Sequence, residues 1–455
     1  MIKKLFLAVF AIVICLCLSG CSIDVSSVEG LMRPPKLSGE NSLLQEAFEK
    51  YLNLSKNTIM KTPISGENRS SFLYYDLDNN GVKEAFAFYS DVSVDENACA
   101  AIFKFVNNEW QLVSNIKGSG EDIFEVDFAD INGDGCLELV ICWTYLKTGE
   151  SDNTASFTNS GERIMSVYSY NGNSTTLITT QPFSKMLVGD FNGDKSDEIL
   201  LVSVDLSEKS KRTIGRILGF NSNYDIVRSY DLILTSMIDV LNIDKDTVTV
   251  EGEKHTRIFV DGGISETAVI TDVVDISHSD FEITLPLYET NISEKPLTIR
   301  DVSTLSADID GDGEIEIPTV ENLPYSSVIN NESSRNLSLT IWSKVENGEL
   351  ITEYKCLMNS LNGYMFIFPE EWINSITAVY NSTNATLRFY EVNESGTLGD
   401  EVFSIRSFSE IKWKENNYDY NRLASSGAIV FGYTVSENSE IITVDDITEN
   451  FVILN

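Results

Sequence analysis

Histidine is almost absent from this sequence, and its scarcity limits the chemistry that the chain can support. Among 455 residues only His255 and His278 occur, and neither lies in a recognisable nucleophile or zinc motif. No glycine-rich phosphate-binding loop is present either. A lone histidine in a strand-rich sequence is more often structural than catalytic, so we assign no catalytic and no cofactor-binding residue.

Basic residues are also scarce. The chain has 33 Lys and Arg against 69 Asp and Glu, which gives a formal net charge of −36. It therefore lacks the basic surface that phosphates need, which excludes nucleic acid as a partner. The acidity suits an exterior where calcium is plentiful, and it would equally keep a surface protein soluble.

The first 20 residues have the pattern of a secretory signal peptide. Lys3 and Lys4 precede an apolar stretch over residues 5–18, and small residues follow. The sequence Leu18-Ser19-Gly20-Cys21 resembles a bacterial lipobox. We therefore expect Cys21 to be lipidated and to anchor an extracytoplasmic protein in the bacterial cell membrane; the alternative is a plain signal peptide that is cut elsewhere.

One order of oxygen-bearing side chains occurs four times. Oxygen ligands at relative positions 1, 3, 5 and 9, a glycine at position 6 and a backbone carbonyl at position 7 are typical of a short loop that wraps Ca²⁺. A strand-like run, Leu139 to Trp143, follows one such loop where an EF-hand would continue as a helix, which predicts a metal-holding β-hairpin. The predicted ligands are Asp76, Asp78, Asn80, Val82 and Glu84; Asp130, Asn132, Asp134, Cys136 and Glu138; Asp190, Asn192, Asp194, Ser196 and Glu198; and Asp308, Asp310, Asp312, Glu314 and Glu316.

The loops recur roughly every 60 residues, and about twice that distance separates Asp190 from Asp308. A fifth copy is therefore expected between them. The segment from Asn242 to Asp246 lies at the right place, but it lacks the glycine and the ninth-position acid. We interpret it as a repeat whose loop has lost its metal.

Each intact loop is followed by an apolar hairpin with an asparagine-rich turn. Asn and Gly tolerate the positive φ that tight hairpin turns need. One period is thus a strand, a loop, a strand and a hairpin, and repetition of such a four-stranded period is typical of a β-propeller. The turns are Asn107-Asn108, Asn171-Gly172, Asn221-Ser222-Asn223 and Asn347-Gly348.

The segments VDFADINGDGCLELVI, MLVGDFNGDKSDEILLV and LSADIDGDGEIEIPTV resemble FG-GAP, or VCBS-type, repeats, which are similar to the repeats of integrin α-chain propellers. The whole chain resembles bacterial cell-surface lipoproteins that carry these repeats. The resemblance covers roughly residues 70–355 and implies a propeller whose hairpin loops hold Ca²⁺. The sequence departs from the pattern at Lys195 and over residues 236–300.

The predicted fold is mainly β: a β-propeller of about five four-stranded blades, one of them degenerate, with a small C-terminal α+β domain. We divide the chain into a signal peptide (1–20), a lipid-anchored tether and helix (21–69), the propeller (70–357) and the C-terminal domain (358–455). The helix, over residues 41–52, is expected to pack on the propeller or to bind a partner.

Four cysteines remain besides those of the N-terminal region. Cys136 and Cys142 lie too far apart along one strand to bond to each other. Cys99 and Cys356 fall in the first and last blades, which a closed ring would make neighbours. Either these two form a disulfide that clasps the ring, or all four are free thiols.

Two functions remain open from the sequence. The first is a lipid-anchored, calcium-binding propeller that acts as a surface binding or scaffold module for protein or glycan ligands. The alternative is a carbohydrate-active envelope enzyme with its site on the propeller face. Because ligand charge and loop rigidity set calcium affinity, we expect the loop at Asp308 to bind tightest and the loop at Asp190, with Lys195 at the glycine position, to bind weakest.

Overall fold

The computed structural model confirms that the chain is mainly β. The predicted signal peptide and Cys21 lie outside the described residues. Within the described part, no helix is long and apolar enough to cross a membrane. The structure describes residues 40–52, 58–91, 95–144, 163–206, 212–287, 297–301, 303–323, 334–335, 337–393, 397–416, 418–436 and 442–454.

Six antiparallel sheets follow one another along the described chain. The first begins with β1 (Thr58–Met60) and β2 (Phe72–Tyr75), which both pair with β3. The hairpin turn at Asn107-Asn108 has positive φ at both residues, 54° and 64°, as the sequence predicts for a tight turn. The sheet is completed by β3 (Glu84–Asp91), β4 (Asp95–Val106) and β5 (Glu109–Lys117).

The second and third sheets repeat the predicted period of a strand, a loop, a strand and a hairpin. Their strand orders are β6-β7-β8-β9 and β10-β11-β12-β13, each following the order of the chain. The second strand of each is buried along most of its length, as expected for apolar runs such as ELVICWT and EILLVSVD. The strands are β6 (Asp122–Ala129), β7 (Glu138–Thr144), β8 (Arg163–Tyr170), β9 (Thr175–Phe183), β10 (Lys185–Gly189), β11 (Glu198–Asp205), β12 (Arg212–Phe220) and β13 (Ile226–Leu234).

The fourth sheet differs from the sequence interpretation. The expected loop at Asn242 to Asp246 does not form, because these residues lie inside the long strand β14 and pair with β15. A tight turn at Glu251-Gly252, with φ of 50° and 91°, joins the two strands where the other sheets have an acidic loop. The strands are β14 (Asp239–Val250), β15 (Glu253–Gly263), β16 (Val269–Ser277) and β17 (Ile283–Thr284).

The fifth sheet extends across the domain boundary predicted at residue 357. Two strands from the expected C-terminal domain, β22 and β28, complete it. One hydrophobic cluster joins Leu339, Leu357 and Phe366 of the fifth sheet to Phe389 of the last sheet. The strands are β18 (Ile317–Asn322), β20 (Ser338–Glu346), β21 (Glu349–Asn359), β22 (Tyr364–Ile367) and β28 (Phe451–Ile453).

The remaining C-terminal residues form the sixth sheet, with the order β19-β23-β24-β25-β27-β26, and three short helices. The terminal helix begins at a Thr443 cap that forms a reciprocal capping box with Asp446. The elements are β19 (Ser334–Arg335), η2 (Glu370–Trp372), β23 (Ile376–Asn381), β24 (Thr386–Val392), β25 (Leu398–Ser409), α4 (Glu410–Glu415), β26 (Asn421–Ser426), β27 (Ile429–Val435) and α5 (Val444–Glu449).

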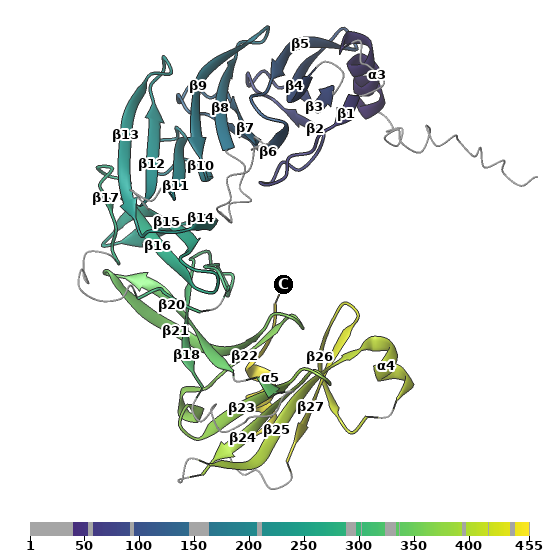
Figure 1. The fold of residues 1–455 in the computed structure, drawn as a ribbon, viewed down its shortest axis with the longest axis vertical. Coiled ribbons are helices and arrows are strands. Elements are labelled where there is room, and N and C mark those ends of the chain that lie inside the picture. Colours follow the sequence, from purple (N-terminus) through teal and green to yellow (C-terminus); the bar gives the residue numbers. More distant parts are fainter. Residues whose placement is uncertain are drawn as a thin grey trace, which may run out of the picture.

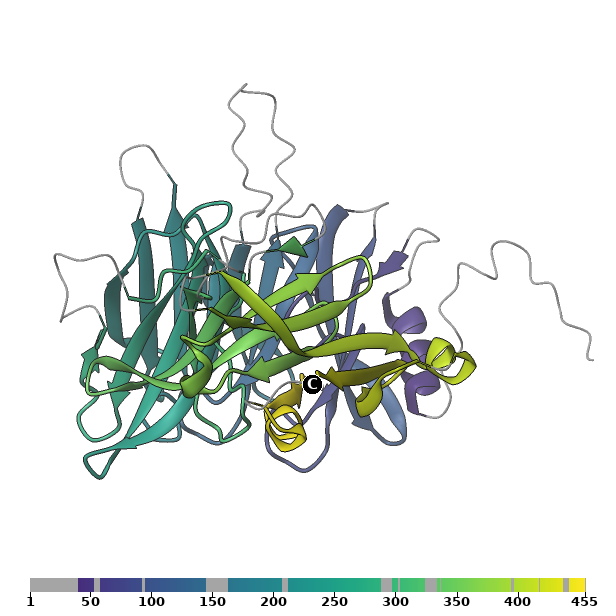
Figure 2. The ribbon, with the colours of Figure 1, turned by 90° about the horizontal axis from the view of Figure 1, so that it is seen from below.

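Neighbouring sheets pack face to face and form an open arc (Figure 1). In the view from below, the green and yellow strands of the C-terminal sheets lie in front of the other sheets (Figure 2). Separate apolar clusters fill the spaces between the first and second, second and third, third and fourth, and fourth and fifth sheets. Cys136, Cys142 and Cys356 are free thiols, so no disulfide joins Cys356 to Cys99. The closure of the sheets into a ring and the number of blades in that ring stay predictions.

The predicted N-terminal helix is α3 (Glu40–Leu52). Its buried residues Leu44 and Phe48 pack against the first sheet. The ring of Phe48 lies edge-on to Tyr89, with a centroid separation of 5.2 Å. The apolar face of this helix is thus covered by the sheet, as one of the two sequence interpretations expects.

Candidate metal-binding loops

All four predicted loops lie directly before the strand or bridge that begins with the ninth-position glutamate: between β2 and β3, between β6 and β7, between β10 and β11, and before β18. They span residues 76–83, 130–137, 190–197 and 308–315. The fourth loop starts from a single bridge between Ala307 and Glu316 instead of a full strand. The regular spacing in the sequence thus corresponds to one repeated structural position.

The first aspartate of each loop holds the turn together by accepting backbone hydrogen bonds. In the second loop, Asp130 Oδ1 accepts from the N–H of Gly133 at 2.8 Å, and Asp130 Oδ2 accepts from the N–H of Gly135 at 2.8 Å. Equivalent bonds reach Asp76, Asp190 and Asp308. This shared bonding fixes the backbone path from the first to the sixth position.

The sixth position has a positive φ in every loop. The angle is 85° at Gly81, 84° at Gly135, 92° at Gly313 and 76° at Lys195. Glycine adopts this conformation without steric cost, whereas a residue with a Cβ loses on the order of 1 kcal/mol. Lys195 is therefore strained in the third loop.

The ninth-position glutamates are buried beneath the loops. Each turns one carboxylate oxygen, Oε2, back to the N–H of the second loop residue, at distances between 2.9 and 3.2 Å. The spacing in the sequence predicted the position of this glutamate but gave no sign of this bond. The pairs are Leu77 with Glu84, Ile131 with Glu138, Phe191 with Glu198 and Ile309 with Glu316.

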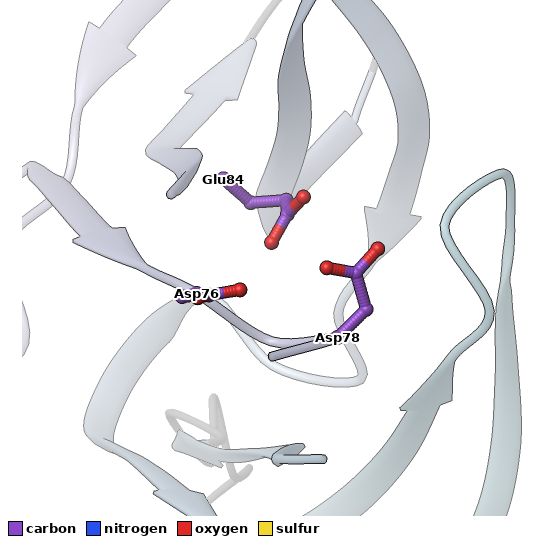
Figure 3. Close-up of side chains that lie close together, drawn as sticks. All are labelled: Asp76, Asp78 and Glu84. Atoms are coloured by element: carbon purple, nitrogen blue, oxygen red, sulfur yellow. The ribbon is translucent and has the colours of Figure 1, made fainter. Parts of the chain in front are cut away.

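The first loop brings three predicted ligands together. Carboxylate oxygens of Asp76, Asp78 and Glu84 lie within 4.8 Å of one another and point into one common space (Figure 3). The buried Oδ1 of Asp78 has no hydrogen-bond partner in the described structure. Because an unsatisfied buried oxygen is costly and a hard cation prefers carboxylate ligands, these three residues could hold a metal ion.

The fourth loop forms a second acidic group of the same kind. Oxygens of Asp308, Asp310 and Glu316 also lie within 4.8 Å of one another. Glu316 is fully buried, and its Oε1 has no hydrogen-bond partner in the described structure. Its surroundings nevertheless differ from those of the first loop, because a lysine lies nearby.

Desolvation dominates the electrostatics of the ninth position. Burial raises the pKa of Glu138, Glu198 and Glu316 to about 7, and it also raises the pKa of Glu84. A positive charge placed next to such a carboxyl favours its ionised form. These glutamates are therefore acids whose charge a bound cation would stabilise.

The second and third loops have asparagine at the third position, and its amide is used within the loop. The Nδ2 of Asn132 donates to Asp134 Oδ2 at 3.0 Å. The Nδ2 of Asn192 donates to Asp194 Oδ2 at 3.1 Å and to Glu198 Oε1 at 2.9 Å. The third loop is thus already closed by its own hydrogen bonds.

Two cations near the loops could not be found from the loop spacing. Arg228, on β13, lies 3.5 Å from Asp194 and 3.8 Å from Glu198 in the third loop. Lys344, on β20, donates to Asp312 at 2.6 Å in the fourth loop. Both come from other strands of the same sheet, so only the strand register brings them to the loops.

Consecutive loops are also linked to one another. The N–H of Leu137 in the second loop donates to the carbonyl of Leu77 in the first, at 2.7 Å. The N–H of Asp197 in the third loop donates to the carbonyl of Asp130 in the second, at 2.8 Å. The first three loops therefore form a continuous hydrogen-bonded series.

A pocket of 510 Å³ opens beside the first loop. Asp76, a member of the acidic triad, lines it together with Lys83 and Asn68. Its other lining residues are Phe72, Leu73, Tyr74 and Tyr75 from β2. The pocket thus combines an apolar wall with charged groups next to the candidate metal position.

No family model and no curated protein matches the sequence. Among solved structures, the chain is similar to an exo-β-1,3-galactanase from Phanerochaete chrysosporium, with 10% identity, 88% of this chain and 92% of that chain covered, and a TM-score of 0.27. The Dos1 propeller matches at 9% identity and a TM-score of 0.26, covering 79% of this chain and 82% of that one. A β-1,3-galactosidase of family GH43 matches at 10% identity and a TM-score of 0.25, covering 77% and 74%.

Proposed function

We propose that this protein is a lipid-anchored, extracytoplasmic calcium-binding β-propeller that acts at the bacterial cell surface as a binding or scaffold module for protein or glycan ligands. The observation that carries the proposal is the convergence of Asp76, Asp78 and Glu84 in a loop that recurs at one position in four sheets. The chain offers oxygen ligands of the kind that Ca²⁺ prefers. Anchorage through Cys21 follows from the lipobox-like sequence.

The arrangement of sheets supports the propeller assignment. Consecutive antiparallel sheets of four or more strands share hydrophobic clusters with their neighbours, as the blades of a propeller do. Each acidic loop leads directly into a strand of its sheet, namely β3, β7, β11 or β18. A metal ion held in each loop would make the turn rigid and so help to keep neighbouring sheets packed against each other.

The residues of the first loop have separate tasks in this proposal. Asp76 fixes the turn through its bonds to the backbone of Asn80 and Gly81. Asp78 and Glu84 bring their carboxylates toward the same point. A calcium ion would supply the positive charge that neutralises these groups, and the side chains already lie in place to receive it.

The pocket beside the first loop supports a binding role. Asp76 belongs both to the acidic triad and to the pocket wall. Calcium bound in this loop would therefore lie next to one side of the pocket and hold the Asp76 side chain there. Such a coupling suits a surface module whose ligand contact depends on extracellular calcium.

Calorimetric titration of the mature protein with calcium tests the proposal. We expect Asp78→Asn to lose one bound ion, because the variant removes a carboxylate from the triad. The matched control is Glu109→Gln, which changes an exposed acid on β5 of the same sheet and should leave the titration unchanged. An absence of calcium uptake by the wild-type protein would contradict the proposed metal role.

A further inference from the structure

The fourth loop contains a lysine that lies among its carboxylates. Lys344 Nζ is 2.6 Å from Asp312 Oδ2 and 3.7 Å from Glu316 Oε1. The lysine side chain is 12% exposed and the glutamate side chain is fully buried. The oxygen of Glu316 nearest to this ammonium group is Oε1, the one that has no hydrogen-bond partner in the described structure.

The third loop has an arginine in a comparable relation to its acids. Arg228 Nη1 lies 3.5 Å from Asp194 Oδ2 and 3.8 Å from Glu198 Oε1. Its guanidinium carbon is 5.0 Å from the centre of the Phe281 ring, a contact that helps to hold the side chain in place. In both loops the cation approaches the fifth and ninth positions.

The first two loops have different neighbours. Among the described residues, no Lys or Arg forms an ion pair with the acids of the loops at Asp76 and Asp130. In place of a cation, a tyrosine hydroxyl from the next sheet reaches the ninth-position glutamate. Tyr170 lies 3.4 Å from Glu84, and Tyr224 lies 3.0 Å from Glu138.

We propose that Arg228 and Lys344 are built-in counter-cations of the third and fourth loops, so that these two loops close without metal and calcium is taken by the loops at Asp76 and Asp130. This inference deepens the proposed function and depends on it for the first two loops. For the third and fourth loops the inference rests on the ion pairs that Arg228 and Lys344 form with the loop acids. It also changes the affinity order expected from counting carboxylates, because the Asp308 loop moves from first place to join the Asp190 loop at the end.

The physical reason is the competition between two cations for one acidic group. A tethered ammonium or guanidinium is always present beside the loop, and it is attached to a strand of the same sheet. A divalent ion entering the loop would meet the like charge of this side chain at short range, and screening by water is weakest beside the ninth-position glutamates, whose side chains are 2% and 0% exposed. It would have to displace the side chain before binding.

Native mass spectrometry and calorimetry of the mature protein, with calcium as the probe, count the bound ions. We expect two ions for the wild type, three for Arg228→Gln, three for Lys344→Gln and four for the double variant. Matched controls are Arg216→Gln and Lys355→Gln, which remove cations paired with Asp231 and Glu321 away from the loops. Both controls should still bind two ions.

Four ions bound to the wild type would overturn the inference while leaving the proposed calcium function standing. Two ions in the wild type and in both variants would also overturn it. If the wild type binds none but each variant binds one, the built-in cations are supported and the proposed calcium role of the first two loops fails. Should Lys344→Gln fail to fold, the wild-type count still decides, and Lys344→Arg, which keeps the charge, should remain at two.

Discussion

The hydroxyl of Tyr224 donates a hydrogen bond of 3.0 Å to Oε1 of Glu138, a residue of the preceding sheet. The other oxygen of this glutamate accepts from the backbone N–H of Ile131 in its own loop, at 3.2 Å. Glu138 thus joins the second acidic loop to the third sheet. The same relation recurs one sheet earlier between Tyr170 and Glu84, at 3.4 Å.

This relation predicts the effect of removing the hydroxyl. Tyr224→Phe should lower the free energy of unfolding by about 1 kcal/mol, because the buried carboxyl loses a hydrogen-bond donor. Chemical denaturation measures the change. Tyr230→Phe is the matched control, since this more exposed tyrosine on the same sheet makes only a ring contact with Phe281 among the interactions described. Equal losses in both variants would contradict the assigned role of the Tyr224 hydroxyl.

Backbone strain at Lys195 gives a second prediction. Its φ of 76° suits glycine, so Lys195→Gly should stabilise the protein by up to about 1 kcal/mol. Lys195→Ala should bring no such gain, because alanine retains a Cβ. Thermal and denaturant unfolding of the two variants compare them directly. A gain of the same size for alanine would show that removal of the lysine charge, and not relief of strain, is responsible.

The half-buried carboxyl of Glu125 on β6 predicts a pH dependence. Desolvation raises its pKa from 4.5 to about 7, with a further contribution from Asp127. The folded state therefore holds this proton at pH values where the unfolded chain has released it, and stability falls as pH rises from about 4.5 to 7.

Glu125→Gln removes this titration, so its stability relative to wild type should increase steadily over the same pH range. Urea denaturation at several pH values measures the difference. Glu109→Gln, at an exposed site, serves as the control and should run parallel to wild type. A constant difference between Glu125→Gln and wild type across this range would contradict the assigned protonation.

The fifth sheet predicts the result of a truncation. A chain that ends at residue 357 loses β22 and β28, and with them the pairing of Cys356 with Ile367 and of Leu357 with Phe366. We expect hydrogen exchange in β20 and β21 to become faster than in the full chain, while β6 to β9 keep their protection. Unchanged exchange in β20 and β21 would show that the domain boundary lies at 357, as the repeat pattern suggested.

The local features of the fold could be predicted because they depend on nearby residues. The Asn107-Asn108 turn and the loop that begins at Asp130 each carry their own geometric requirement, namely positive φ or a set of oxygen ligands at fixed spacing. The segment around Asp246 misled the prediction because its acids resemble a loop. In the structure Asp246 is buried and pairs with Arg257 at 2.9 Å, a contact that only the β14–β15 register reveals.

The features that modify the site depend on distant residues and could not be predicted from spacing. Lys344 lies 32 residues after Asp312 in the chain, on β20, and Tyr224 lies in the sheet after that of Glu138. A count of carboxylates within a loop includes none of these partners. The ligand pattern could therefore be read from the sequence, but its charge balance could not.

The most direct test of the calcium assignment is a crystal structure of the mature protein grown with calcium and examined for anomalous scattering. We predict a peak among the carboxylates of Asp76, Asp78 and Glu84, with oxygen distances of about 2.3–2.6 Å, and a second peak in the loop at Asp130. We predict no peak beside Arg228 or Lys344. Absence of a peak at the first loop in calcium-saturated crystals would contradict the account.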